Sequence, residues 1–189
     1  MASRTQLVCL CEGEEGRSID PVFINALMKA LKPGWLRRQG SNAVRLVPCG
    51  SRAEVIERMP HELRNCLRTG GDTTLMVWAD CDHDCEDGDA LKARFRQAAR
   101  AAGLDDEALG GVVFIFAKDR LENWVEFLLD GQTDESREGP RAKSNRSVAE
   151  AARALARHCD AGKPVGNFPP SLQWSCANWR SLAERMRAS

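Results

Sequence analysis

Short, largely apolar runs alternate with helix-like segments over the first 131 residues, and this alternation constrains the fold more than any other feature of the sequence. The runs have the length and composition of buried parallel strands. They are Gln6–Cys11, Ala43–Pro48, Thr73–Ala79 and Gly110–Ala117. Each is followed by a segment with apolar residues at helical spacing. Strands that alternate with helices predict an α/β fold, in which a parallel four-stranded sheet is sandwiched by helices.

The helix-like segments carry start and stop signals. Asp20-Pro21 begins the first of them and Pro33-Gly34 ends it, while Ser51 caps the second and Gly70-Gly71 ends it. The third and fourth segments have apolar positions over Leu91–Ala99 and over Leu121–Leu129. These signals place the four helices between and after the four strands.

The remainder of the chain predicts an appendage. Residues 1–131 form one catalytic domain, and the polar residues 132–146 read as a linker or mobile loop. Residues 147–189 then form a C-terminal helical extension packed on the core. Its two helices are expected over Ser147–Cys159 and Leu172–Met186.

The amino-acid composition indicates where in the cell the protein is located and which partners it can bind. The longest apolar runs fall far short of a membrane span, and the N-terminus has no apolar signal segment. We therefore expect a cytoplasmic protein with no membrane partner, in which the eight cysteines stay reduced. The net charge is zero, but residues 1–131 carry 17 basic and 21 acidic side chains, against 10 and 6 in the remainder. A basic C-terminal third suits a phosphate backbone, although such a surface also serves solubility.

Acidic residues stand where two strands end. Glu12 follows the first strand, and Asp80, Asp82 and Asp84 follow the third. The carboxyl ends of parallel strands share one edge of the sheet, so these side chains can converge although they are distant in sequence. Carboxylates brought that close repel unless a cation lies between them. The pattern predicts a site for Mg²⁺ or Mn²⁺.

The two acidic motifs resemble those of the Toprim domain, which topoisomerases, primases and small nucleases share. CEGEEGRSID is similar to its glutamate motif and WADCDHD to its Asp-x-Asp motif, and the resemblance covers roughly residues 6–131. It implies a Rossmann-like Toprim fold in which Glu12 binds metal or transfers a proton. It also implies that Asp80 and Asp82 hold magnesium, with Asp84 at a less regular position.

Residue types and modules that the chain lacks exclude some of the activities found among Toprim proteins. Topoisomerases need a tyrosine nucleophile, and the chain contains no tyrosine. A primase needs template-binding and zinc-binding modules for which the chain has no room. Metal-dependent phosphodiester hydrolysis needs only ions, a water and a positioning cation. We therefore expect a nuclease that acts on DNA or RNA.

A second stretch, AKDRLENWVEFLL, resembles the corresponding region of OLD-type and related Toprim-like proteins, some of them linked to phage defence. By this resemblance Glu122 adds a metal ligand, and Lys118 stabilises charge on the scissile phosphate. Glu126 lies on the same helical face as Glu122. For Glu126 a structural role is favoured.

Basic residues beyond the fourth helix are candidates for contact with nucleic acid. Arg141, Lys143 and Arg146 lie together, and Arg153 and Arg157 lie one helical turn apart. A solvated helix face is the favoured reading for these basic residues as a group.

Other readings stay open. The tight Cys81-x-His83-x-Cys85 spacing is a weaker candidate for zinc. A metal-dependent phosphatase of the haloacid-dehalogenase type also uses Asp-x-Asp, but after its first strand. A non-catalytic interaction subunit of a defence or toxin–antitoxin complex is a further alternative. A partner ATPase and an oligomer are both compatible with the sequence.

Overall fold

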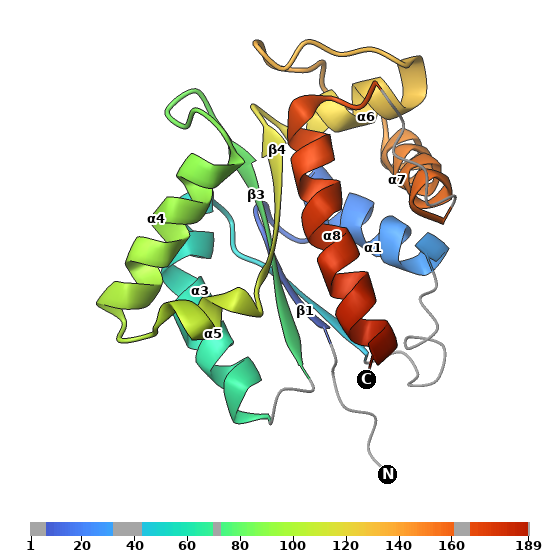
Figure 1. The fold of residues 1–189 in the computed structure, drawn as a ribbon. Coiled ribbons are helices and arrows are strands. Elements are labelled where there is room, and N and C mark those ends of the chain that lie inside the picture. Colours follow the sequence, from blue (N-terminus) through green and yellow to red (C-terminus); the bar gives the residue numbers. More distant parts are fainter. Residues whose placement is uncertain (1–6, 32–42, 70–72, 161–166, 189) are drawn as a thin grey trace.

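Four parallel strands form a single sheet in the order β2-β1-β3-β4 (Figure 1). The computed structural model describes residues 7–31, 43–69, 73–160 and 167–188. The strands are β1 (Leu7–Cys11), β2 (Val44–Pro48), β3 (Thr74–Cys81) and β4 (Val113–Lys118). The predicted parallel α/β architecture is confirmed.

Two strand boundaries differ from those predicted. β3 extends to Cys81, so Asp80 is part of the strand and lies opposite Ala117 of β4. The predicted start of β4 at Gly110 is wrong, because a short helix, α5 (Asp106–Gly110), precedes the strand. The side chain of Asp105 caps this helix by accepting a hydrogen bond from the backbone N–H of Ala108, at 2.9 Å.

Helices cover both faces of the sheet, as predicted. In Figure 1, α3 and α4 lie on one side of the strands, and α1 and α7 lie on the other. The helices besides α5 are α1 (Ile19–Leu31), α3 (Arg52–Arg68), α4 (Gly88–Ala101), α6 (Leu121–Asp130), α7 (Asn145–Asp160) and α8 (Pro170–Ala188). The C-terminal helices share a hydrophobic core with β1, β3 and α1, to which α7 contributes Val148 and Leu155.

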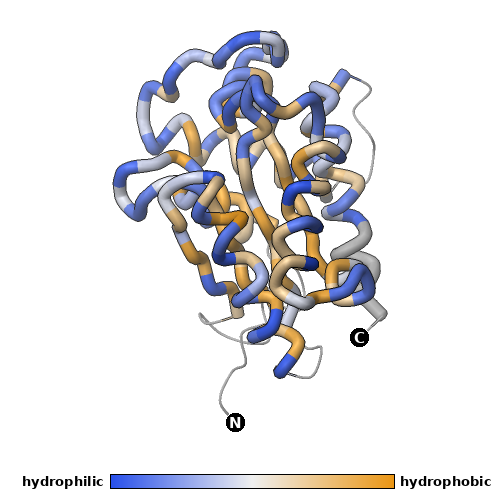
Figure 2. Tube along the Cα trace, turned by 90° about the vertical axis from the view of Figure 1, so that its left-hand side faces the viewer, coloured by the Kyte–Doolittle hydropathy of each residue, from blue (hydrophilic) through white to orange (hydrophobic). Residues whose placement is uncertain are grey.

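Alternate residues of each strand enter two separate cores. Trp78 of β3 lies between Phe23 of α1 and Trp124 of α6, with ring centroids 6.1 and 6.2 Å away. On the other face, Phe95 of α4 stacks on Phe116 of β4 at 5.6 Å. Figure 2 shows the strands as the hydrophobic centre of the trace, and the loops beyond their carboxyl ends as mainly hydrophilic. In the part of the chain described, no helix combines the length and the apolar character needed to cross a membrane.

Helix α8 lies alongside β4, the outer strand (Figure 1). The Ser175 hydroxyl accepts a hydrogen bond from the backbone N–H of Phe116 at 2.9 Å and donates to its carbonyl at 3.1 Å. The Asn178 amide donates to the carbonyl of Phe114 at 3.0 Å. Side chains of α8 therefore satisfy backbone groups of β4 that face away from β3.

The polar segment that follows α6, predicted as a linker, is held by one buried side chain. The amide of Asn123 donates to the carbonyls of Asp134 and Arg137 at 3.1 and 3.0 Å. Its oxygen accepts from the backbone N–H of Gly139 at 2.8 Å. Three hydrogen bonds to a fully buried residue fix the path of this segment over α6.

A pair of glycines joins the loops that follow β1 and β2. Gly13 and Gly50 exchange backbone hydrogen bonds of 2.8 and 2.9 Å, and both have φ of +83°. A Cβ atom at Gly13 would lie 2.2 Å from the Cβ of Ser18. Because this junction directly follows Glu12, it fixes the direction in which the chain leaves the sheet.

We expect Gly13→Ala to destabilise the fold more than Gly16→Ala. Both positions have a positive φ, which costs about 1–2 kcal/mol for alanine. Only Gly13 adds a steric overlap, since nothing lies within 4 Å of a Cβ at Gly16. Urea unfolding should show a loss of about 1–2 kcal/mol for Gly16→Ala and a clearly larger loss for Gly13→Ala. Equal losses would contradict the junction described here.

Candidate functional site

Four acidic side chains from four elements meet at the carboxyl edge of the sheet. Glu12 directly follows β1, and Asp80 lies near the end of β3. Asp20 and Glu122 lie in the first turns of α1 and α6. Burial raises the pKa of Asp80, and the charges of the other three carboxylates raise it further, because all four lie within electrostatic reach of one another.

The Glu12 carboxylate is fixed by the neighbouring strand. Its Oε1 atom accepts a hydrogen bond of 2.7 Å from the backbone N–H of Asp80. Burial raises the pKa of Glu12 to about 7, against the opposing effect of hydrogen bonds from the backbone N–H groups of Asp80 and Arg52. Glu12 therefore sits at the point where β3 and the first turn of α3 both present backbone donors.

Asp20 is also a member of the site, although its position in the sequence predicts only a helix start. Burial, together with the charges of Glu12 and Glu122, raises the pKa of Asp20 to about 7. The signal was present in the sequence, because a helix that follows a parallel strand begins at the edge where that strand ends. Any acidic residue in the first turn of such a helix is a candidate for the site.

Asp80 is the centre of this group. Burial raises its pKa well above the ordinary value, and the charges of Asp20, Glu12 and Glu122 raise it further. Four such carboxylates cannot all be ionised in a buried place without a compensating positive charge. Hard carboxylate oxygens are the donors that Mg²⁺ and Mn²⁺ prefer, so the donor set fits such an ion in chemical type.

The side chains are not arranged as a closed metal site. Among the residues that the structure describes, no three His, Cys, Asp or Glu side chains are grouped so that they could hold a metal ion. The mutual repulsion of the carboxylates is a physical reason for this open arrangement. A bound cation would need them to turn toward a common centre.

The other two predicted aspartates are paired with arginines. Arg52, whose side chain is only 16% exposed, lies 3.2 Å from Asp82 and 2.8 Å from Asp84. Asp84 also pairs with Arg94 at 2.7 Å, and the hydrogen bonds from Arg94 and Arg52 lower the pKa of Asp84 to about 2. Asp82 still acts on the central group, because its charge raises the pKa of both Glu12 and Asp80. Asp84 is therefore held in ion pairs with the two arginines. Asp82 interacts both with Arg52 and with the central carboxylates.

Lys118, the last residue of β4, is engaged by a loop. Its ammonium group donates hydrogen bonds to the backbone carbonyls of Cys85 and Glu86, the second at 3.0 Å. These bonds tie the loop after β3 to β4. In this structure Arg52 and Arg94, and not Lys118, are cations that contact the aspartate cluster.

The residues of the zinc alternative have different surroundings. His83 is exposed, and its Nε2 atom lies 3.4 Å from Oδ1 of Asp119. Cys81 and Cys85 are buried, and both thiols donate to the carbonyl of Asp87. Asp119 is itself unusual, because it is buried with φ of 63° and its Oδ2 atom has no hydrogen-bond partner among the described residues.

The remaining predicted residues lie outside the central group. Glu126 accepts a hydrogen bond of 2.8 Å from the hydroxyl of Thr133, which agrees with the structural role favoured for it. Arg141, Lys143 and Arg146 are exposed, in the segment after α6 and at the start of α7.

Comparison of the chain with models of known protein families, and with curated proteins, finds no match.

The raised pKa values predict how the stability of the metal-free protein depends on pH. Between about pH 4, where free carboxyl groups titrate, and pH 7, the native protein binds more protons than the unfolded chain. Stability should therefore fall as the pH rises through this window. With a chelator present, we expect the Tm to fall from pH 5 to pH 8 by at least about 2–4 °C from these groups, equivalent to about 1 kcal/mol.

The variant Glu12→Gln/Asp20→Asn removes both titrating groups and should lose much of this fall. Glu14→Gln is the matched control, because Glu14 is exposed and, among the described residues, forms an ion pair only with Arg17, at 3.1 Å. A double variant whose Tm falls with pH as steeply as that of the wild type would show that these two carboxyl groups are not raised in pKa.

Proposed function

We propose that this chain is a magnesium- or manganese-dependent nuclease that hydrolyses phosphodiester bonds of DNA or RNA. The observation that carries the proposal is the convergence of Glu12, Asp20, Asp80 and Glu122 at the edge of a parallel sheet where ligands of such sheets bind. Burial and neighbouring charges raise the pKa of Glu12, Asp20 and Asp80, and such a group favours a divalent cation as its partner.

In this proposal Asp80, Glu12, Asp20 and Glu122 hold the cation. When bound, a divalent ion lowers the pKa of a coordinated water and neutralises charge on a phosphoryl oxygen. The protein's own contribution is to fix the carboxylates. The backbone N–H of Asp80 holds Glu12 in place, and the rigid starts of α1 and α6 hold Asp20 and Glu122.

Arg52 supplies positive charge beside this centre. It contacts the carbonyl of Asp80 at 3.2 Å and the carboxylate of Asp82 at 3.2 Å. A guanidinium in that position would stabilise the developing charge of a transferring phosphoryl group. Lys118, the cation expected from the sequence, would instead hold the loop that carries Asp82 and Asp84.

The order of the motifs supports a Toprim-like assignment within the Rossmann-like class. Glu12 follows the first strand and Asp80 and Asp82 lie at the end of the third, which is the arrangement that the resemblance implies. We place the activity in the cytoplasm, in phage defence. Buried cysteines in the hydrophobic core support a reducing compartment. Burial raises the pKa of the Cys9 thiol to about 12 and that of the Cys66 thiol to about 11.

Cleavage assays with purified protein test the proposal. Single- and double-stranded DNA and RNA are incubated with Mg²⁺, Mn²⁺ or a chelator. We expect cleavage only with the metal ions, and a loss of at least about 100-fold in rate in Glu12→Gln and Asp80→Asn, because each removes charge from the centre. Glu14→Gln, which changes an exposed carboxylate two residues from Glu12, should cut like the wild type.

Metal binding gives a readout independent of activity. Mg²⁺ should raise the Tm of the wild type, since an ion that binds only the native state stabilises it, and Asp80→Asn should lose most of that increase. Release of phosphate from monoesters without cleavage of nucleic acid would favour the phosphatase reading. A Tm insensitive to both metals would overturn the proposal.

A further inference from the structure

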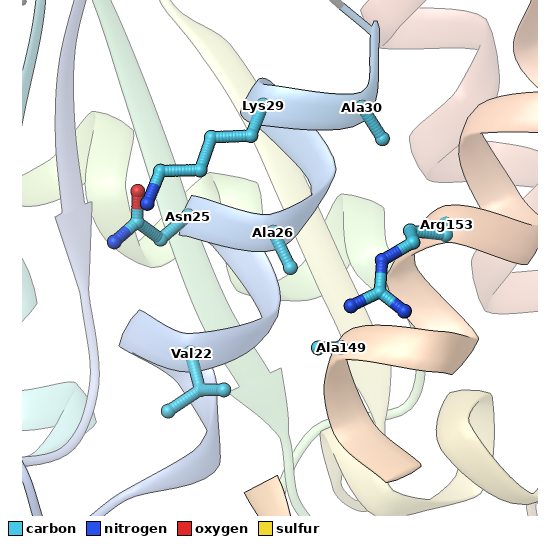
Figure 3. Close-up of a pocket in the computed structure, with 7 residues that line it drawn as sticks. All are labelled: Val22, Asn25, Ala26, Lys29, Ala30, Ala149 and Arg153. Carbon is cyan, nitrogen blue, oxygen red and sulfur yellow. The ribbon is translucent and has the colours of Figure 1, made fainter. Parts of the chain in front are cut away.

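A shallow groove of about 530 Å³ runs along the seam between α1 and α7 (Figure 3). Small side chains line its floor, namely Ala26 and Ala30 of α1 and Ala149 of α7. Arg153 reaches from α7 toward α1, while Asn25 and Lys29 extend along the other side of α1 (Figure 3). The groove therefore combines a floor without bulky side chains and a cation on each rim.

The two rim cations have no acidic partner in the part of the chain that the structure describes. Lys29 and Arg153 are exposed, and neither has an ion pair with any carboxylate of the described residues. By contrast, Arg52 and Arg94 are paired with aspartates. Exposed cations without an acidic partner are available to an anionic ligand.

The exposed face of α7 adds to the positive charge of the groove. Arg146, Arg153 and Arg157 recur at helical spacing on this face, and Glu150 is the acidic residue between them. Three arginines against one glutamate leave the face basic. The floor offers no large aromatic or aliphatic anchor of the kind that dominates protein interfaces, so charge and not apolar burial must supply the affinity.

Helix α1 contributes residues to both the acidic site and the groove. Asp20 lies in the first turn of α1, and Lys29 lies nine residues further along the same helix. At 1.5 Å per residue the two positions are about 14 Å apart along the helix axis. Nine residues also place the two side chains on opposite sides of the helix, so a nucleic-acid strand that rises by 3.4 Å per nucleotide needs at least about four nucleotides to reach from one to the other.

We propose that the α1–α7 groove binds the phosphate backbone of a nucleic-acid strand at least about four nucleotides from the bond that is cut. This inference rests on the proposed nuclease function, and it adds the path of the substrate and a length requirement. Lys29 and Arg153 contact phosphates, and the alanine floor lets the backbone approach the helices. The contacts carry no base specificity, because they address only the backbone.

Binding without cleavage tests the groove separately from catalysis. Anisotropy of a labelled single-stranded 20-nucleotide probe is measured in chelator for the wild type and for Lys29→Gln/Arg153→Gln. We expect about tenfold weaker binding at low salt, and a plot of log affinity against log salt that is shallower by about 1.4, since each lost phosphate contact removes about 0.7 on single strands.

The matched control is Arg96→Gln/Arg100→Gln. It makes the same change in net charge, but on α4 at the opposite face of the sheet, where both arginines lie near Asp106. Its affinity should equal that of the wild type. Because Lys29 and Arg153 are exposed, the groove variant should also keep the wild-type Tm.

Cleavage of substrates of different length tests the geometry. The groove variant should cut long strands more slowly, through a raised KM with kcat unchanged. On substrates that end within two nucleotides of the cut bond, the variant and the wild type should be equal, because such strands do not reach Lys29.

The outcomes separate the two proposals. Equal probe binding by the groove variant and the wild type would overturn the groove, and would leave the nuclease standing if metal-dependent cleavage is seen. Groove-dependent binding without cleavage would overturn the nuclease alone. Competition by polyglutamate as strong as that by an oligonucleotide of the same charge would overturn the assignment to nucleic acid and indicate an acidic protein partner.

Discussion

The hydrogen bond from the backbone N–H of Asp80 to the carboxylate of Glu12 is the contact on which the rest of the site depends. It joins the ends of two neighbouring parallel strands, β1 and β3, and holds one acidic side chain directly beside another. The junction of Gly13 with Gly50 closes the loop behind Glu12 and fixes the backbone from which this side chain extends. Asp20 and Glu122 then approach the same place from the starts of two helices, and the cost of burying charge there appears as the raised pKa values of Asp20 and Asp80.

Most of the fold could be predicted because each strand and helix carries a local signal. Short apolar runs gave the strands, and capping residues such as Ser51 gave helix starts, which the structure shows as a complete capping box with Glu54. The start of β4 was misplaced because glycines at 110 and 111 read as a strand boundary, whereas the cap at Asp105 begins a short helix before them. A strand boundary and a short helix carry sequence signals of similar strength here, and tertiary packing decides which of the two forms.

The site could be predicted only in outline. The sheet edge was deducible from topology, and it places Glu12 and Asp80 together. The sequence did not show that Asp84 forms ion pairs while Asp80 belongs to the buried acidic group. This difference depends on Arg52 and Arg94, which come from two different helices. The same holds for Lys118, whose reach to two backbone carbonyls reflects the path of the loop after β3. Long side chains choose partners in three dimensions, and spacing along the chain does not reveal them.

Helix α8 also limits how this sheet can assemble with other chains. With Ser175 and Asn178 bonded to the backbone of Phe116 and Phe114, β4 cannot recruit an additional strand from another molecule. Growth of the sheet by β-augmentation is thereby restricted to β2, the strand at the opposite border. Any partner that docks by strand addition would have to approach there, away from the outer strand that carries Lys118.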